Sequence, residues 1–302
     1  MTRRTALVTG GTGFVGSHLV RRLVAEGWLV HAIVRPESET ASLTEYQNNV
    51  NLHVHNGTMA SIREIIDEAQ PEVVFHLASL FLSEHRPQDI ESLIDTNLLF
   101  GTQLVEAMAG AGVTKMINTG TSWQHYQNLE YSPVNLYAAT KQAFETLLQY
   151  YIEACSLRVV TLNLFDTYGP RDPRSKLINL LRRVASDKEP LAMSPGEQPI
   201  DLVHVEDVAR CFVVAAESLL DGTSNCHARY AVSSEEVLTV RELVAKIEVL
   251  IGRPLPIVWG GRPYRPREVL ALWQGTRLPG WNPVIPLDRG LEQLFCEYRS
   301  SD

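Results

Sequence analysis

Cysteine is scarce in this 302-residue sequence, and no two of the four cysteines have the spacing of a metal site or a disulfide framework. We therefore expect no metal site, and reduced thiols at all four positions, as in a cytoplasmic protein: Cys155, Cys211, Cys226 and Cys296. The start of the sequence lacks a signal-peptide pattern, and no run reaches the ~18 apolar residues of a membrane span. Basic residues are not in excess either, because the net charge is −8. This balance argues against nucleic acids and acidic membranes as partners.

Strand-like and helix-like segments alternate along the chain, and 45% of its residues are hydrophobic, enough for a substantial core. The expected strands are residues 5–9, 29–34, 52–55, 72–79, 113–118, 157–164, 199–203 and 230–232. The expected helices are residues 13–26, 62–69, 88–109, 136–154, 175–186, 205–218, 238–251 and 287–298. This alternation predicts an α/β fold with a parallel, doubly wound sheet, in one large domain or two fused lobes.

A glycine-rich turn joins the first expected strand to the first expected helix. Gly10 can adopt backbone angles that a Cβ forbids, Gly13 leaves room for a diphosphate, and Gly16 allows the helix to pack closely on the strand. The free N–H groups at the start of the helix would face the phosphates. An ordinary glycine-rich turn is the alternative. The strand before the glycines and the helix after them favour a dinucleotide site.

The residue after the second expected strand bears on the choice of cofactor. An acidic side chain there would accept hydrogen bonds from ribose hydroxyls and select NAD, but the sequence has Arg35. A guanidinium suits a 2′-phosphate, which a carboxylate would repel. We therefore favour NADP(H) over NAD, the alternative being that Arg35 is an ordinary exposed residue of a loop.

Tyr137 and Lys141 lie four residues apart on an expected helix, so the phenol and the ammonium share one face. The nearby lysine is expected to lower the pKa of Tyr137 toward neutrality. Tyr137 could then donate a proton to a carbonyl or accept one from an alcohol. Such a pair is common by chance on exposed helices. Its place after the fifth strand, with hydroxyls just upstream at Thr121 and Ser122, favours catalysis.

Three arginines crowd into a segment rich in proline and glycine near the end of the chain: Arg262, Arg265 and Arg267. They fit either a solvated loop or a binding site for a diphosphate other than that of the cofactor. The sequence leaves both interpretations open.

Together these features resemble the extended short-chain dehydrogenases/reductases, the family of NAD(P)-dependent nucleotide-sugar epimerases, dehydratases and reductases. The resemblance covers nearly the whole chain and includes residues 10–16, 76–79, 97–102, 121, 137–141, 202–209 and 280–283. It implies a Rossmann-type NADP-binding domain over residues 1–170, to which residues of about 200–232 return, and a smaller C-terminal α/β substrate lobe over 171–302. A nucleoside-diphosphate sugar would bind between them, in a homodimer.

The resemblance also implies roles for single residues. Tyr137 would be the acid/base, Lys141 would lower its pKa and hold the nicotinamide ribose, and Thr121 would bind the reacting oxygen. The cofactor would contact Gly10, Thr12, Gly13, Phe14, Val15, Gly16, Arg35, Thr58, Leu77, Ala78, Ser79, Asn97, Thr119, Tyr137, Lys141, Leu164 and Phe165. The substrate would contact Ser79, Thr121, Ser122, Trp123, Asp166, Lys176, Leu177, Arg262 and Arg267. Among the arginines, Arg267 is the first choice for the substrate diphosphate.

Departures from the family pattern narrow the expected reaction. Thr121 is followed by Ser122 and Trp123, whereas the sugar 4,6-dehydratases have an Asp-Glu pair there, so the chain lacks the groups that eliminate water. Residues 118–124 and 261–265 look like those of CDP-abequose and paratose synthases. We therefore expect NADPH-dependent reduction at C4 of a nucleotide-linked 4-keto-6-deoxyhexose, giving a deoxysugar for glycosylation. A 4-epimerase with tightly bound NAD and a non-catalytic nucleotide sensor are the alternatives.

Overall fold

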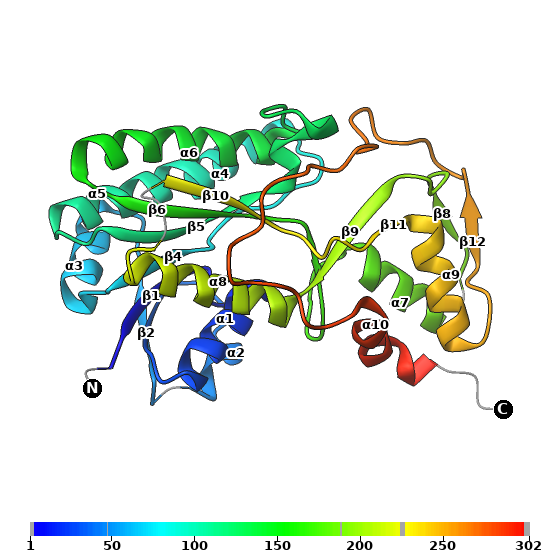
Figure 1. Cartoon of the computed structure of the whole chain (residues 1–302), viewed down its shortest axis with the longest axis horizontal. Helices are drawn as coiled ribbons and strands as arrows, with labels where there is room; N and C mark the ends of the chain where they lie inside the picture. The colour runs from blue at the N-terminus through cyan, green and yellow to red at the C-terminus, as the bar shows by residue number, and fades with distance from the viewer. Residues whose placement is uncertain (1–2, 47, 188, 224–226, 299–302) are drawn as a thin grey trace.

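A seven-stranded sheet, parallel throughout, dominates the computed structural model, which describes residues 3–46, 48–187, 189–223 and 227–298 (Figure 1). The strands lie in the order β10-β6-β5-β4-β1-β2-β3. Their bounds are β1 Thr5–Thr9, β2 Leu29–Val34, β3 Val50–Val54, β4 Val73–His76, β5 Lys115–Thr121, β6 Arg158–Leu164 and β10 His227–Val232. The direction of winding reverses between β1 and β4, so the expected doubly wound parallel sheet is confirmed.

Helices cover both faces of this sheet, which explains why its central strands are buried along most of their length. Adjacent residues of each central strand enter opposite cores, such as Leu7 and Val8 of β1. One face packs against α1 (Phe14–Ala25) and α8 (Val205–Leu220). The other packs against α3 (Met59–Ala69), α5 (Phe100–Gly110) and α6 (Leu136–Cys155). The short helix α2 (Ala41–Thr44) adds Leu43 to the first core.

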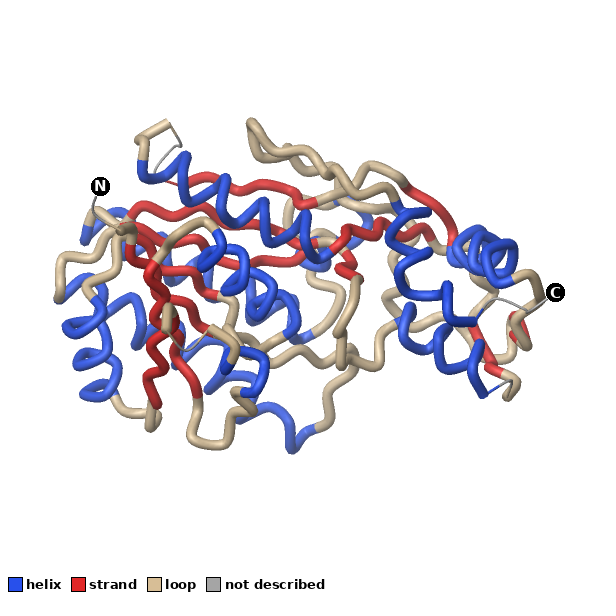
Figure 2. Tube along the Cα trace, turned by 90° about the horizontal axis from the view of Figure 1, so that it is seen from below, coloured by secondary structure: helices blue, strands red, loops and turns tan. Residues whose placement is uncertain are grey.

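A smaller lobe lies beyond the end of the sheet at which β6 finishes (Figures 1 and 2). It has its own apolar core, built from α7, α9, α10 and short strands. The strands form two small sheets, one of β7 (Asp166–Tyr168), β9 (Pro199–His204) and β11 (Val237–Thr239), the other of β8 (Leu191–Met193) and β12 (Ile257–Trp259). The helices are α7 Leu177–Asp187, α9 Val240–Ile251 and α10 Leu287–Phe295.

The chain passes between the two parts several times. The segment after β12 runs back to the large sheet, where the N–H of Ala231 donates to the carbonyl of Thr276 over 2.8 Å (Figure 1). Asp207 of α8 holds the end of this segment, because its carboxylate accepts from the N–H groups of Val284 and Ile285. The Trp281 indole in turn donates to the Asp207 carbonyl. The domain boundary expected near residue 170 stays a prediction, since segments after it contribute to a core of the large sheet and to the core of the smaller lobe.

Some expected elements differ in the structure. The helix expected over residues 88–109 is four successive pieces, namely a 3₁₀ turn (Pro87–Asp89), α4 (Ile90–Ile94), a π-helical turn (Asp95–Leu99) and α5. The third strand starts at Val50 rather than at residue 52, and the fourth ends at His76 rather than 79. The strands β7, β8, β11 and β12 are missing from the expectations, because three residues are too few to show a period of two.

Among the described residues, every helix is too short or too polar to span a bilayer. The described part of the chain also brings together no set of three or more His, Cys, Asp or Glu side chains suited to a metal. Cys155, Cys211 and Cys296 are free thiols, and Cys226 lies outside the described residues.

Candidate active site

The glycine-rich turn has the geometry that a diphosphate site requires. Gly10 has a φ of +71°, and a Cβ on it would lie 2.7 Å from the backbone nitrogen of Ala78. A Cβ on Gly16 would collide with the Gly10 carbonyl oxygen. The start of α1 has Gly13 as its N-cap, with no side-chain hydrogen bond to the first N–H groups. These residues therefore fit a nicotinamide dinucleotide whose phosphates face the helix start.

Two residues expected near the adenosine end have different surroundings. Arg35 follows β2, is 71% exposed, and pairs with Glu37 over 3.2 Å. Thr58 is the N-cap of α3, where its hydroxyl oxygen accepts from the N–H of Ser61 and donates to Asn56. Thr58 thus stabilises the start of α3. Arg35 can exchange its exposed partner Glu37 for another anion.

Asn97 lies in the π-helical turn and is 2% exposed. Its Oδ1 accepts from the hydroxyl of Ser79 and the N–H of Leu80, while its Nδ2 donates to the Leu80 carbonyl and to Thr140. All four hydrogen-bonding positions of the amide are occupied by protein groups. In this structure Asn97 fastens the loop after β4 to α6, and its expected contact with the cofactor stays a prediction.

Tyr137 and Lys141 lie on α6 as expected, but their electrostatics differ from the expectation. Burial raises the pKa of Tyr137 to about 12, although a hydrogen bond with Ser79 and the charge of Arg174 oppose this. Burial likewise lowers the pKa of Lys141, which is 3% exposed, to about 8. The expectation that Lys141 brings the tyrosine pKa toward neutrality is wrong for this structure, because desolvation raises the pKa of Tyr137 and Lys141 is not among the groups that lower it.

Thr121 ends β5 beside this helix. Its Oγ1 accepts from the N–H of Trp123, and its own N–H donates to Oε1 of Gln124 over 3.0 Å. Gln124 is fully buried and also contacts α6. The nearby Thr119 hydroxyl donates to the carbonyl of His76 and so joins β5 to β4.

A cavity of about 710 Å³ opens between the large sheet and the smaller lobe. This volume is typical of small-molecule sites. Of the expected substrate contacts, the cavity lining includes Ser122, Trp123, Asp166, Lys176, Leu177 and Arg262. Arg265 lines it too, whereas Arg267 does not. The Arg267 guanidinium instead lies over the Tyr126 ring and donates to Ser132. The structure therefore does not support the choice of Arg267 as the arginine that binds the substrate diphosphate.

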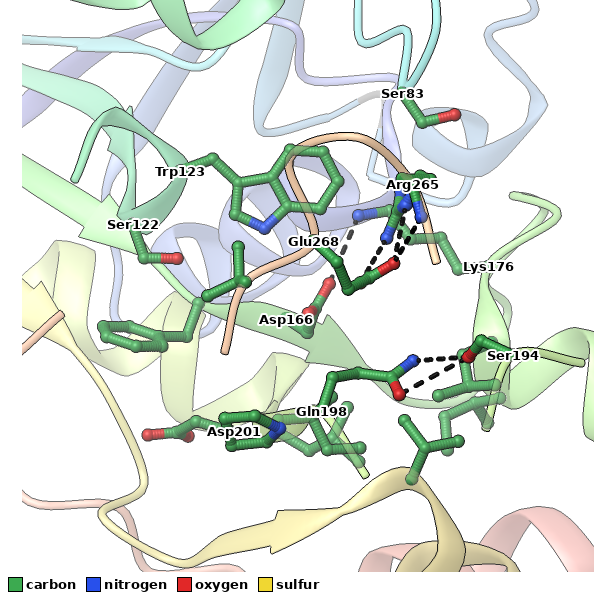
Figure 3. Close-up of a pocket in the computed structure, with 18 of the residues that line it drawn as sticks. Ser83, Ser122, Trp123, Asp166, Lys176, Ser194, Gln198, Asp201, Arg265 and Glu268 are labelled. Atoms are coloured by element: carbon green, nitrogen blue, oxygen red, sulfur yellow. Dashed lines mark hydrogen bonds and ion pairs between the residues drawn. The ribbon is translucent and has the colours of Figure 1, made fainter. Parts of the chain in front are cut away.

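Charged side chains gather beside the Trp123 ring in the cavity (Figure 3). The Lys176 ammonium lies 3.4 Å from Asp166 and 4.2 Å from the centre of the Phe81 ring. Arg265 pairs with Glu268 at 3.2 Å and lies over the Trp123 ring. Both cations therefore have a carboxylate partner that an anionic ligand would have to replace.

Phe81 connects the cavity to the tyrosine. Its ring meets Tyr137 edge-on with centroids 5.0 Å apart and lies 5.6 Å from Trp123. In the same lining, Trp273 stacks on His125 at 4.0 Å and lies parallel to Phe165 at 6.4 Å, while Leu164 ends β6 just before Phe165. Sequence reasoning missed Phe81, Gln124, His125 and Trp273, because only the three-dimensional packing brings them here.

The fold and this site define a nicotinamide-dependent enzyme of the extended short-chain dehydrogenase/reductase type. The NAD dependent epimerase/dehydratase family model matches residues 6–227, and the chain belongs to this family. The resemblance inferred from the sequence motifs is therefore confirmed.

Curated relatives of two kinds match most of the chain. A CDP-abequose synthase of Yersinia pseudotuberculosis is 26% identical over 266 residues, covering 88% of this chain and 90% of that protein. A UDP-glucose 4-epimerase of Mycolicibacterium smegmatis is 26% identical over 324 residues, covering 97% and 98%. The solved UDP-glucose 4-epimerase of Thermotoga maritima with UDP-glucose matches with a TM-score of 0.85 and 25% identity, over 97% of each chain.

The surroundings of His76 predict a pH-dependent stability. Burial and the charge of Lys141 lower the pKa of His76 from 6.5 to about 3, so it stays neutral in the folded protein while the unfolded chain takes up a proton. Its contribution to stability is complete above pH 6.5 and declines as the pH falls. Relative to His76→Asn, the free energy of unfolding of the wild type should drop by about 2 kcal/mol more between pH 7 and pH 5.

Urea denaturation at each pH measures this difference. His85→Asn, at an exposed position, is the matched control variant. If the free energy of unfolding of the wild type and of His76→Asn changed equally with pH, the lowered pKa of His76 would be contradicted.

Proposed function

We propose that this enzyme uses NADPH to reduce the C4 keto group of a nucleoside-diphosphate 4-keto-6-deoxyhexose. The observation that carries the proposal is the place of Tyr137, which lies on the same helix as Lys141 and meets Phe81 of the cavity lining edge-on. The pKa of Tyr137, raised by its surroundings to about 12, favours the protonated hydroxyl. A protonated phenol suits an enzyme that delivers a proton to a reduced carbonyl.

The similarity to CDP-abequose synthases supports a reductase of a nucleotide-linked deoxysugar. The turn after β5 agrees with it, because Ser122 and Trp123 line the cavity where an elimination would need carboxyl groups. Phe81 and Trp123 form an apolar wall beside Tyr137, which suits the methyl group of a 6-deoxy sugar better than a hydroxymethyl group.

The residues of the chain divide the work of this reaction. The helix start after Gly13 would hold the cofactor diphosphate, and the bound NADPH supplies the hydride. Thr121 would orient the keto oxygen, and Tyr137 would give it a proton. Lys141 supplies positive charge at the same helix face, and the cations Lys176 and Arg265 would accept the substrate diphosphate in place of Asp166 and Glu268.

The reaction is tested with a panel of nucleoside-diphosphate 4-keto-6-deoxyhexoses. We expect one NADPH oxidised for each sugar reduced, and Tyr137→Phe should lower kcat by about 100-fold or more while leaving NADPH affinity unchanged. Tyr131→Phe, at an exposed position outside the cavity lining, should behave as the wild type. Full activity of Tyr137→Phe would refute the role of this residue.

The second candidate is a nucleoside-diphosphate-hexose 4-epimerase, favoured by the similarity to UDP-glucose 4-epimerases. It predicts NAD that stays bound through purification and turnover of an intact hexose without added NADPH. Finding both, with no NADPH oxidation on the keto sugars, would replace the reductase proposal.

Arg35 is the proposed contact for the 2′-phosphate of NADPH. An exposed ion pair such as Arg35–Glu37 is weak, so a phosphate can displace the carboxylate. We expect Arg35→Ala to weaken NADPH binding by about 10-fold or more with little change for NADH, as measured by calorimetric titration. Arg63→Ala, at an exposed position of α3, serves as the control. Equal losses for both cofactors would refute the contact.

We also propose a homodimer. Large apolar side chains are exposed on α4, the π-helical turn and α6, which neighbour one another: Ile90, Ile94, Leu99, Leu147 and Tyr150. Sedimentation velocity should therefore give twice the mass of one chain, and Leu147→Glu should shift it toward the monomer. A monomeric wild type would exclude this.

A further inference from the structure

Arg174 lies in the segment between β7 and α7, and the proposed reaction does not yet use it. Its guanidinium forms two parallel hydrogen bonds with Asp172, from Nε to Oδ1 over 2.7 Å and from Nη2 to Oδ2 over 2.8 Å. Nη2 also donates to the carbonyl of Thr167 over 2.9 Å. Because the side chain of Asp172 is only 5% exposed, the guanidinium is held against a buried carboxylate in a fixed orientation.

Another residue holds the backbone of this segment. The side-chain amide of Asn179, in α7, donates to the carbonyls of both Asp172 and Arg174, each over 2.8 Å. The N–H of Arg174 donates to Oδ1 of Asp172 over 3.0 Å. These bonds shape the segment without the guanidinium, so the position of the Arg174 side chain calls for another explanation.

The guanidinium reaches the start of the helix that follows the glycine-rich turn. It lies over the ring of Phe14, with Cζ 4.4 Å from the ring centre. Phe14 is the first residue of α1, directly after the N-cap Gly13. Burial raises the pKa of Tyr137, and the nearby charge of Arg174 opposes this. Arg174 thus brings a positive charge to the helix start that would hold the cofactor diphosphate.

Two of the five N–H donors of this guanidinium remain for a ligand. Asp172 and Thr167 use the other three, and within the described part of the chain Nη1 has no hydrogen-bond partner. Lys176 and Arg265 must each release a carboxylate before they bind an anion, whereas Arg174 can do so and still keep Asp172. The oxygens of a diphosphate suit such a pair of donors.

We propose that Arg174 binds the diphosphate of the dinucleotide cofactor, so that the segment between β7 and α7 takes part in cofactor binding. The proposal rests on the proposed function only for the presence of a nicotinamide dinucleotide. NAD and NADPH carry the same diphosphate, so a reductase and an epimerase would both use this contact. It can therefore be measured without substrate and without turnover.

The test is a calorimetric titration with ADP-ribose, which has the diphosphate but neither the nicotinamide nor a 2′-phosphate. Arg174→Ala should weaken the binding of ADP-ribose and of NADPH by about 10-fold or more each, because charged hydrogen bonds to the diphosphate are lost. Adenosine 2′-phosphate lacks the diphosphate and should bind to Arg174→Ala as it binds to the wild type.

Arg171→Ala is the matched control, because Arg171 is an exposed arginine of the same segment. It removes the same charge and should leave the affinity for ADP-ribose at its wild-type value. An unchanged affinity of Arg174→Ala for ADP-ribose would overturn the proposal. An equal loss in Arg171→Ala would overturn it as well, since the titration would then report the charge of the segment rather than a contact of Arg174.

A measurement on the wild type covers the case in which Arg174→Ala does not fold. Phenylglyoxal modifies accessible arginines, and the Arg174 side chain is 32% exposed. Peptide mapping by mass spectrometry should show that ADP-ribose protects Arg174 from this modification and that adenosine 2′-phosphate does not. Equal modification of Arg174 with and without ADP-ribose would overturn the proposal. Absence of any NADPH oxidation by the wild type would refute the proposed function, while ADP-ribose binding would still decide the role of Arg174.

Discussion

The close contact between the backbone of Gly10, after β1, and that of Ala78, after β4, sets the geometry of the whole site. The winding reverses between β1 and β4, so the loops that follow these strands leave in opposite directions and open a crevice. At this point Gly10 lies so close to Ala78 that no Cβ fits between them. The close approach exposes the start of α1 on one side of the crevice and the loop carrying Ser79 on the other.

Buried polar groups then hold the surrounding segments in place. The amide of Asn97 joins the loop after β4 to α6, the amide of Gln124 joins β5 to α6, and the carboxylate of Asp207 joins α8 to the returning tail. Each connects segments that are distant in the sequence, and each has most or all of its hydrogen-bonding positions filled by protein. These hydrogen bonds preorganise the site, and burial governs the pKa values of Tyr137 and Lys141 within it.

Sequence patterns that depend only on neighbouring residues were sufficient to predict much of the fold. The glycine-rich turn is a local signal, because a positive φ at Gly10 and the close packing at Gly16 involve residues within one turn. The same is true of the four-residue spacing of Tyr137 and Lys141. The π-helical turn at Asn97 and the three-residue strands lack such signals, because interactions with other segments form them.

The sequence by itself determined the parallel sheet, the dinucleotide turn, the tyrosine–lysine helix and the family, since all of these follow from periodicity and short motifs. Only the tertiary structure decided that Arg265 lines the cavity while Arg267 lies on Tyr126, because both arginines occur in one irregular segment. It also decided how far burial shifts the pKa values of Tyr137 and Lys141. Charge states of this kind depend on burial and on partners from other strands, which spacing along a chain does not record.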